Sequence, residues 1–192
     1  GTGISVPILA TKNINNVYLN NTSFNFGSGK MLLSGHLKIA NPKVINIAAK
    51  VKTRGGIENL NTIFNTSNFL FKKGSFDLKA HINGDLKHID KLIANANSTI
   101  LVKNTAVYLA ANKLQIPIKI LDVTIKDNSA SLNKLQIKLA SGDAIDFSGK
   151  VDNIDALLTN SSKNKVKTEL NVHSKKLSWI DFTNLFNKNK TV

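Results

Sequence analysis

The sequence predicts a mainly β protein with a few short α-helices, built as a curved antiparallel sheet of meander or groove type. Three observations support this. Apolar and polar residues alternate along most of the chain, turn residues recur at intervals of about ten residues, and only three short stretches space their apolar residues as helices do. Such alternation gives a sheet one apolar and one polar face, so we expect the helices to pack on or cap the apolar face.

The turn dipeptides divide the alternating pattern into strands. Asn41-Pro42 ends one strand because proline lacks the N–H that a sheet requires, and Asn83-Gly84 and Asp127-Asn128 are typical of tight turns. Asn20-Asn21 indicates an irregularity within the first strand. The expected strands are 17–26, 30–39, 44–52, 75–82, 114–120, 123–126, 135–139, 144–151 and 166–173.

Helical spacing of apolar residues predicts three short helices, over 57–64, 86–94 and 179–186. Asp85 and Ser178 precede the second and third of them and are expected to act as N-caps. The remaining residues, 187–192, are rich in Lys and Asn, and we expect this tail to fray.

The length of 192 residues predicts a single β-rich domain over 1–192, and the start at Gly1 without an initiator Met leads us to expect a processed or trimmed fragment of a longer protein. Segments 24–64 and 139–186 resemble each other as an internal repeat. Each has a turn, a strand ending in Ser-Gly and a basic residue, a second strand and an amphipathic helix. Ser34-Gly35 and Ser148-Gly149 occupy equivalent places, and repetition of this kind favours an elongated sheet over a compact catalytic fold.

The charge balance leaves two interpretations open. A net charge of +14 suggests an anionic partner, such as nucleic acid or a membrane surface. The positive charge comes almost entirely from lysine, with Arg54 the single arginine, which also fits a solvated lysine surface produced by codon bias. No recognisable nucleic-acid-binding module accompanies the charge, so we expect no specific nucleic-acid partner.

The sequence contains no catalytic or metal-binding constellation that we recognise. The absence of cysteine excludes disulfides and thiolate metal sites, and the four histidines lack metal-ligand spacing. The acidic residues fall in predicted turns and helix starts, where Asp caps backbone N–H groups. No nucleophile elbow, P-loop or dinucleotide fingerprint is present. The stretch 107–125 is the most apolar, and charged residues interrupt it too often for a spanning helix. We therefore expect a non-enzymatic protein without a cofactor.

Three consecutive strand patterns carry a family resemblance. Residues 120–132, 135–139 and 145–151 read as a strand, a small-residue turn, a strand, a glycine turn and a strand ending in Ser-Gly. This order resembles the C-terminal region of AsmA-family proteins, and 74–80, 84–86 and 176–182 fit the same pattern. The resemblance implies a periplasmic protein, anchored in the inner membrane by a segment not in this chain. It further implies a curved sheet whose apolar interior conducts phospholipid toward the outer membrane.

The resemblance offers no fixed functional residues, so the candidate site comes from the strand alternation. The expected apolar face would be lined by Ile116, Ile118, Ile120, Leu135, Ile137 and Leu139. The leading hypothesis is that this face shields or carries phospholipid. The alternative is that the same residues form an ordinary hydrophobic core under the short helices. Two further hypotheses stay open. The first is a structural module that assists outer-membrane assembly through edge strands and envelope-protein partners. The second is a domain that binds an anion, either nucleic acid or polysaccharide.

Overall fold

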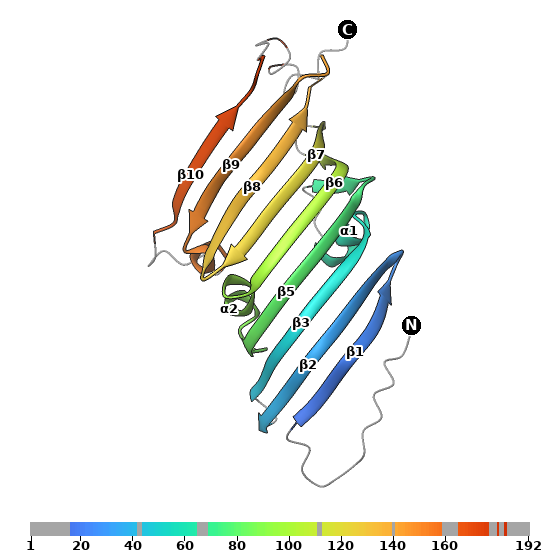
Figure 1. Cartoon of the computed structure of the whole chain (residues 1–192), viewed down its shortest axis with the longest axis vertical. Coiled ribbons are helices and arrows are strands. Elements are labelled where there is room, and N and C mark those ends of the chain that lie inside the picture. Colours follow the sequence, from blue (N-terminus) through green and yellow to red (C-terminus); the bar gives the residue numbers. More distant parts are fainter. Residues whose placement is uncertain are drawn as a thin grey trace.

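The computed structural model describes residues 16–41, 44–64, 69–110, 113–139, 141–158, 165–176, 180 and 183. Ten strands form one antiparallel sheet in which almost every strand pairs with the next along the chain, so the predicted meander is confirmed (Figure 1). β1 and β10 are the two edges. The strands are β1 (Asn16–Phe26), β2 (Gly29–Asn41), β3 (Val44–Gly56), β4 (Phe69–Lys72), β5 (Ser75–Asp85), β6 (Asn97–Leu109), β7 (Leu114–Lys126), β8 (Ser129–Lys138), β9 (Ala144–Asp152) and β10 (Lys167–His173).

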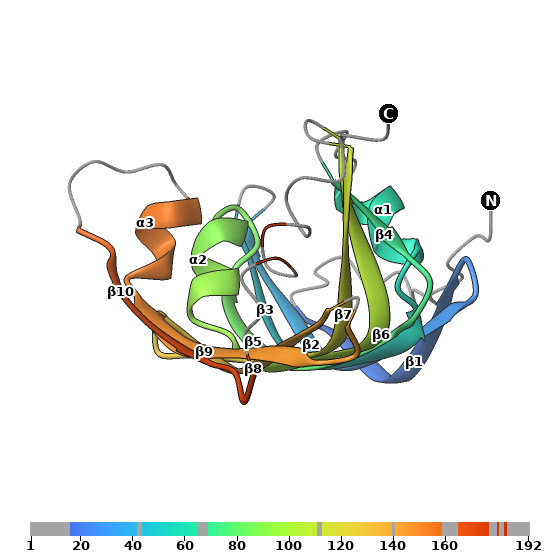
Figure 2. The same ribbon diagram turned by 90° about the horizontal axis from the view of Figure 1, so that it is seen from above.

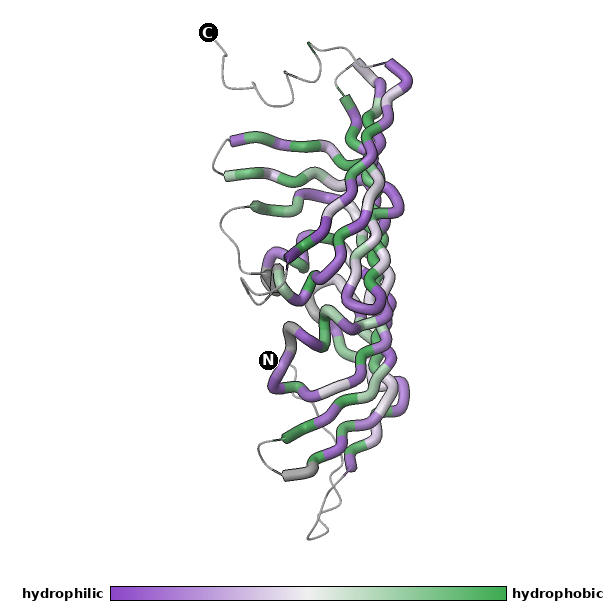
Figure 3. The backbone as a smooth tube through the Cα atoms, turned by 90° about the vertical axis from the view of Figure 1, so that its left-hand side faces the viewer, coloured by the Kyte–Doolittle hydropathy of each residue, from purple (hydrophilic) through white to green (hydrophobic). Residues whose placement is uncertain are grey.

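Three short helices stand on one face of the curved sheet, which we call the concave face (Figure 2). They are α1 (Asn59–Phe64), α2 (Ile89–Ala94) and α3 (Ile154–Leu158). Hydrophobic and hydrophilic residues alternate along many of the strands (Figure 3). This alternation places apolar side chains on the concave face, where the core clusters lie, and mostly polar ones on the opposite, convex face. The described core forms two clusters on the concave face. One is Leu92 of α2 with Ile47 and Ala49, and the other is Ile57, Phe76 and Val102.

Several local expectations were wrong. Asn83-Gly84 does not form a turn, because both residues lie in β5 and pair with β3. Gly84 passes directly under α2, where an added Cβ would lie 2.9 Å from Leu92 Cδ2. The second helix begins at Ile89, and Asp85 does not cap it, because its carboxylate accepts a bond from the Lys87 N–H instead. The structure also adds β4, β6 and α3, and it joins 114–120 and 123–126 into β7.

The internal repeat stays a prediction. Residues 42–43 alone separate β2 from β3, whereas α3 lies between β9 and β10, and most of the predicted helix 179–186 and the tail 187–192 lie outside the described residues. The two Ser-Gly glycines do share a physical role. A Cβ added to Gly35 would lie 2.6 Å from the Cα atom of Ala49. A Cβ added to Gly149 would collide with the carbonyl group of Glu169. Both glycines therefore let a neighbouring strand approach closely.

The sheet bends along a line, which we call the crease, that crosses the continuous strand formed by β4 and β5 and the neighbouring strands β6 and β7. β4 and β5 pair with β6 in one unbroken register, so they are a single strand interrupted at Lys73 and Gly74, whose φ angles are 55° and 98°. Beside this break, Asn104 of β6 also has a positive φ, of 53°. Asn104 falls opposite Lys119 of β7, where the register with β8 shifts by one residue. The interruptions thus line up across the sheet as bulges that bend it.

Beyond the crease, the ends of β6 and β7 rise from the sheet on the same side as the helices, with β4 and α1 beside them (Figure 2). Hydrogen bonds hold this raised part. Asn61 of α1 donates to the Phe71 carbonyl at 2.9 Å and accepts from the Phe71 N–H at 2.8 Å, which satisfies the free edge of β4. The Thr105 hydroxyl donates to the Lys72 carbonyl at 3.3 Å.

On the other side of the concave face, the β7–β8 turn joins two helices. Asp127 and Asn128 have φ angles of 50° and 60°, which confirms the predicted turn. The Asn128 amide donates to Asp155 Oδ1 at 2.7 Å and accepts from the Asp155 N–H at 2.9 Å. The Asn128 N–H donates to the Ala94 carbonyl at 3.1 Å. One turn residue therefore connects the end of α2 to the start of α3.

Replacing Gly74 by alanine should destabilise the protein by roughly 2–4 kcal/mol, because the new Cβ combines an unfavourable φ with crowding. It would lie 2.6 Å from the Lys103 carbonyl oxygen and 2.9 Å from Thr105 Cβ. Gly142→Ala is the matched control, since Gly142 has a similar φ of 94° but open space around its Cβ position. Urea unfolding of both variants measures the difference, and equal losses would contradict a crowded crease.

Replacing Asn128 by alanine should cost roughly 2–3 kcal/mol of unfolding free energy, since it removes two side-chain hydrogen bonds and leaves a positive φ on a residue that disfavours it. Asn133→Ala serves as the comparison. Asn133 also makes two side-chain hydrogen bonds, to Asp122 and Thr124, but it is exposed and does not connect helices. Chemical denaturation should show a much smaller loss for Asn133→Ala.

Candidate functional site

Four of the six predicted site residues lie together on the concave face. Ile118 of β7 lies directly opposite Ile137 of β8, and Leu121 lies opposite Leu135. Leu121 packs against the concave core cluster that contains Phe76. Because directly opposite residues share a face of the sheet, Ile118, Leu135 and Ile137 also belong to the concave face. Ile116, two residues before Ile118, lies on that face as well.

The other two predicted residues are placed differently. The extra residue Lys119 reverses the alternation of β7, so Ile120 lies opposite Gln136 on the convex face. Leu139 comes after the end of β8, and its N–H donates to the Asp143 carbonyl at 2.8 Å. Leu139 is only 2% exposed, so it belongs to the packed core rather than to an open surface.

The concave face contains further apolar side chains that the sequence reasoning missed. Phe147 of β9 lies opposite Leu135, and Val123 of β7 lies opposite Leu132. Val123 and Leu132 could be found from the sequence only by counting the bulges at Lys119 and at Asn133, where the strand register shifts, because each bulge reverses the alternation. We call the following half-buried residues the apolar floor: Ile116, Ile118, Val123, Ile125, Leu132, Leu135, Ile137, Phe147 and Val151.

The apolar floor is hydrocarbon throughout. Toward the edge of the sheet it continues into Leu170 and Val172 of β10, which are 61% and 59% exposed. Among the described concave-face residues of β7 to β10, Thr168 alone has a polar side chain. The floor residues are outside both described core clusters. This surface offers almost no side-chain hydrogen bonds, so it suits a ligand that needs none.

The convex face behind the apolar floor is mostly polar, and three ion pairs lie on its described part. Lys134 and Asp146 approach to 3.7 Å, Lys150 and Asp152 to 2.8 Å, and Lys167 and Glu169 to 3.4 Å. The Lys150 ammonium donates to Asp152 and, with the Ser129 hydroxyl, holds the pKa of that carboxyl below its ordinary value of 3.8. The same contact raises the pKa of Lys150 above its ordinary value.

Neither a metal cluster nor a spanning helix is found in the described part of the chain. No group of three or more His, Asp or Glu side chains gathers there in a way that could hold a metal ion. No helix among the described residues combines the length and the apolar character needed to cross a bilayer.

Comparison with known proteins adds no relative. No protein-family model matches the chain, and no curated protein or solved structure is similar enough to match it. The AsmA resemblance therefore stays a prediction, and the functional argument depends on the two faces of the sheet.

The Asp152 contacts predict a pH-dependent contribution to stability. A carboxyl whose pKa is lowered by folding stabilises the folded state above its unfolded pKa, and this stabilisation is lost as the pH falls through the folded pKa. Asp152→Asn should therefore lower the melting temperature at pH 7 by at most a few degrees, and this deficit should shrink progressively as the pH falls below about 4. Thermal unfolding of the wild-type chain and the variant at several pH values from 7 to 3 measures this difference in melting temperature. Asp127→Asn, at a 3.9 Å contact between two exposed side chains, should show almost no deficit at any pH.

Proposed function

We propose that this chain is a non-enzymatic module of an AsmA-type cell-envelope protein and that its apolar floor shields phospholipid acyl chains. The observation that carries the proposal is the hydrocarbon floor on a curved, open sheet. Acyl chains need no hydrogen bonds, and covering apolar surface is worth about 25 cal/mol for each Å² removed from water. Polar or charged ligands would lose their hydration on this surface without compensation.

The arrangement of the flanking elements supports the same proposal. α2 and α3 stand on one side of the concave face, and the raised ends of β6 and β7 stand on the other with β4 and α1 (Figure 2). The raised end of β7 contains Ile116 and Ile118, so the apolar floor continues onto this border. A floor bordered in this way limits the contact of a bound acyl chain with water. By resemblance, the module would act in the periplasm, between the inner and the outer membrane, within a protein anchored in the inner membrane.

Native mass spectrometry of the purified chain, followed by solvent extraction, should reveal co-purified phospholipid at a defined stoichiometry. Leu135→Asn should reduce the lipid-bound fraction at least about fivefold, since a buried amide without a partner disfavours contact with an acyl chain. Ile120→Asn is the matched control on the convex face of the neighbouring strand and should leave the lipid-bound fraction unchanged. Circular dichroism spectra of both variants should match that of the wild-type chain, which would show that they are folded.

A photocrosslinking experiment keeps the proposal testable if Leu135→Asn does not fold. A benzophenone side chain in place of Phe147 should crosslink phospholipid, whereas the same side chain in place of Tyr18 should not. Tyr18 is 71% exposed but lies on the convex face, since its neighbour Leu19 pairs with the concave Gly35. A lipid-free mass together with no crosslink at Phe147 would contradict acyl-chain shielding.

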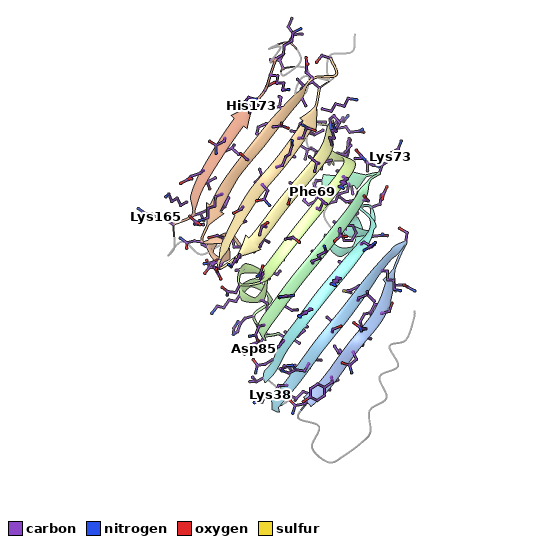
Figure 4. The ribbon with its side chains drawn as sticks, viewed as in Figure 1. Lys38, Phe69, Lys73, Asp85, Lys165 and His173 are labelled. Carbon is purple, nitrogen blue, oxygen red and sulfur yellow. The ribbon has the colours of Figure 1, made fainter. Side chains whose placement is uncertain are left out.

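A second candidate function is an interaction module for envelope proteins, and the edge strand β10 favours it. All seven residues of β10 are exposed. Lys165, two residues before β10, and His173, its last residue, lie at the border of the sheet (Figure 4). An exposed edge offers unpaired backbone groups to an added strand. A lipid-free chain that binds an envelope protein through β10 would favour this function over lipid shielding.

A further inference from the structure

The convex face of β2, β3, β5 and β6 carries a shallow basic trough. Two adjoining hollows, with volumes of about 280 and 590 Å³, share Lys30, Arg54 and Asp77 as lining residues. These three residues lie side by side across the sheet, because Arg54 pairs with Lys30 on one side and with Asp77 on the other. Lys52, Lys79 and Lys103 extend the lining. Five cationic side chains therefore surround one carboxylate.

Within the described part of the chain the cations of the trough form no ion pair, although Asp77 lies directly opposite Arg54 on the neighbouring strand. Among the described residues, none of the five approaches a carboxylate oxygen within 4.0 Å. On the other half of the same convex face, Lys134, Lys150 and Lys167 each have an acidic neighbour, whereas Lys138 has none in the described ranges. What distinguishes the trough is that five cations without an ion pair to any described residue line two adjoining hollows.

The strand pairing makes the concentration of charge unfavourable without a ligand. Lys52 lies directly opposite Lys79, so their Cβ atoms are about 5 Å apart, and like charges at this position repel each other. Both side chains are exposed and can spread into water, which limits the repulsion but does not remove it. An anion bound between them would turn the repulsion into attraction. A local arrangement that disfavours the free protein in this way is typical of a binding site.

We propose that the convex trough binds a phosphate group, presented by a soluble phosphate or by the headgroup of a phospholipid. A phosphate has several strong acceptor oxygens and up to two negative charges, which several cations can contact together. The Arg54 guanidinium supplies a planar pair of donors and the lysines supply point charges, which is the combination that phosphate recognition uses. The smaller hollow is close to the lower limit of small-ligand sites, which suits a phosphate with a short substituent.

This site is independent of the proposed lipid shielding, because the trough and the apolar floor lie on opposite faces of the sheet. Loss of trough binding should leave the co-purified acyl-chain lipid unchanged. Conversely, Leu135→Asn should leave phosphate binding unchanged. The two proposals can therefore fail separately.

The test is a titration of the ¹⁵N-labelled full chain with inorganic phosphate, followed by NMR at constant ionic strength. The amide signals of β2, β3 and β5 around the trough should shift saturably. Lys52→Gln combined with Arg54→Gln should weaken the affinity at least about tenfold, because it removes two charge-assisted contacts. The matched control is Lys119→Gln combined with Lys138→Gln, which removes the same charge from two exposed lysines outside the trough and should change the affinity less than about twofold.

Sedimentation with vesicles distinguishes the two sources of phosphate. Binding to phosphatidylcholine vesicles that contain phosphatidic acid, lost in the trough variant only, would identify a lipid headgroup. Saturable binding of free phosphate without vesicle binding would identify a soluble ligand. The proposal is overturned if phosphate produces no saturable shift or if the control variant loses as much affinity as the trough variant. Binding of duplex DNA with a steep salt dependence, without saturable phosphate binding, would also overturn it and indicate a non-specific polyanion surface.

Discussion

The structure depends on the continuity of backbone hydrogen bonding through the crease. A bend that interrupted the pairing of strands would leave backbone N–H and C=O groups without partners, which is costly where they are buried. Here β4 and β5 keep a single register with β6 across the break at Lys73 and Gly74. The bend falls at Lys73 and Gly74, whose φ angles are both positive, and at Asn104 and Lys119 in the adjoining strands. The raised ends of β6 and β7, and with them one border of the concave face, follow from this continuity.

The two faces of the sheet then present different chemistry from the same strands. Successive side chains of a strand point to opposite faces of the sheet. The strands that place apolar side chains on the concave face therefore also place polar and charged side chains on the convex face. On β8 and β9 several convex charges are paired, as in Lys150 with Asp152. On β3 and β5 they are unpaired, as in Lys52 with Lys79. A protein that holds acyl chains on one face and phosphate on the other would contact both parts of a phospholipid-rich surface.

Much of the fold could be predicted from local patterns, and the errors share one cause. Asp127-Asn128 and Asn20-Asn21 were placed correctly as a turn and an irregularity, because their backbone preferences act within a few residues. Asn83-Gly84 has the same local signature but continues β5, because β3 supplies partners on one side and Leu92 covers Gly84. In the candidate site, Ile118 and Ile137 were placed together on the concave face, whereas Ile120 was not, because one extra residue reverses the alternation.

The sequence by itself determined the class of the fold, the alternation that separates apolar from polar side chains, and the excess of lysine. These are properties of single residues and their nearest neighbours along the chain, so they require no knowledge of which strands meet. Only the tertiary structure decided where the crease crosses the sheet, which side chains form the apolar floor, and which lysines lack an acidic neighbour. Each of these is a relation between residues on adjacent strands, and the register that sets it depends on bulges such as the one at Lys119.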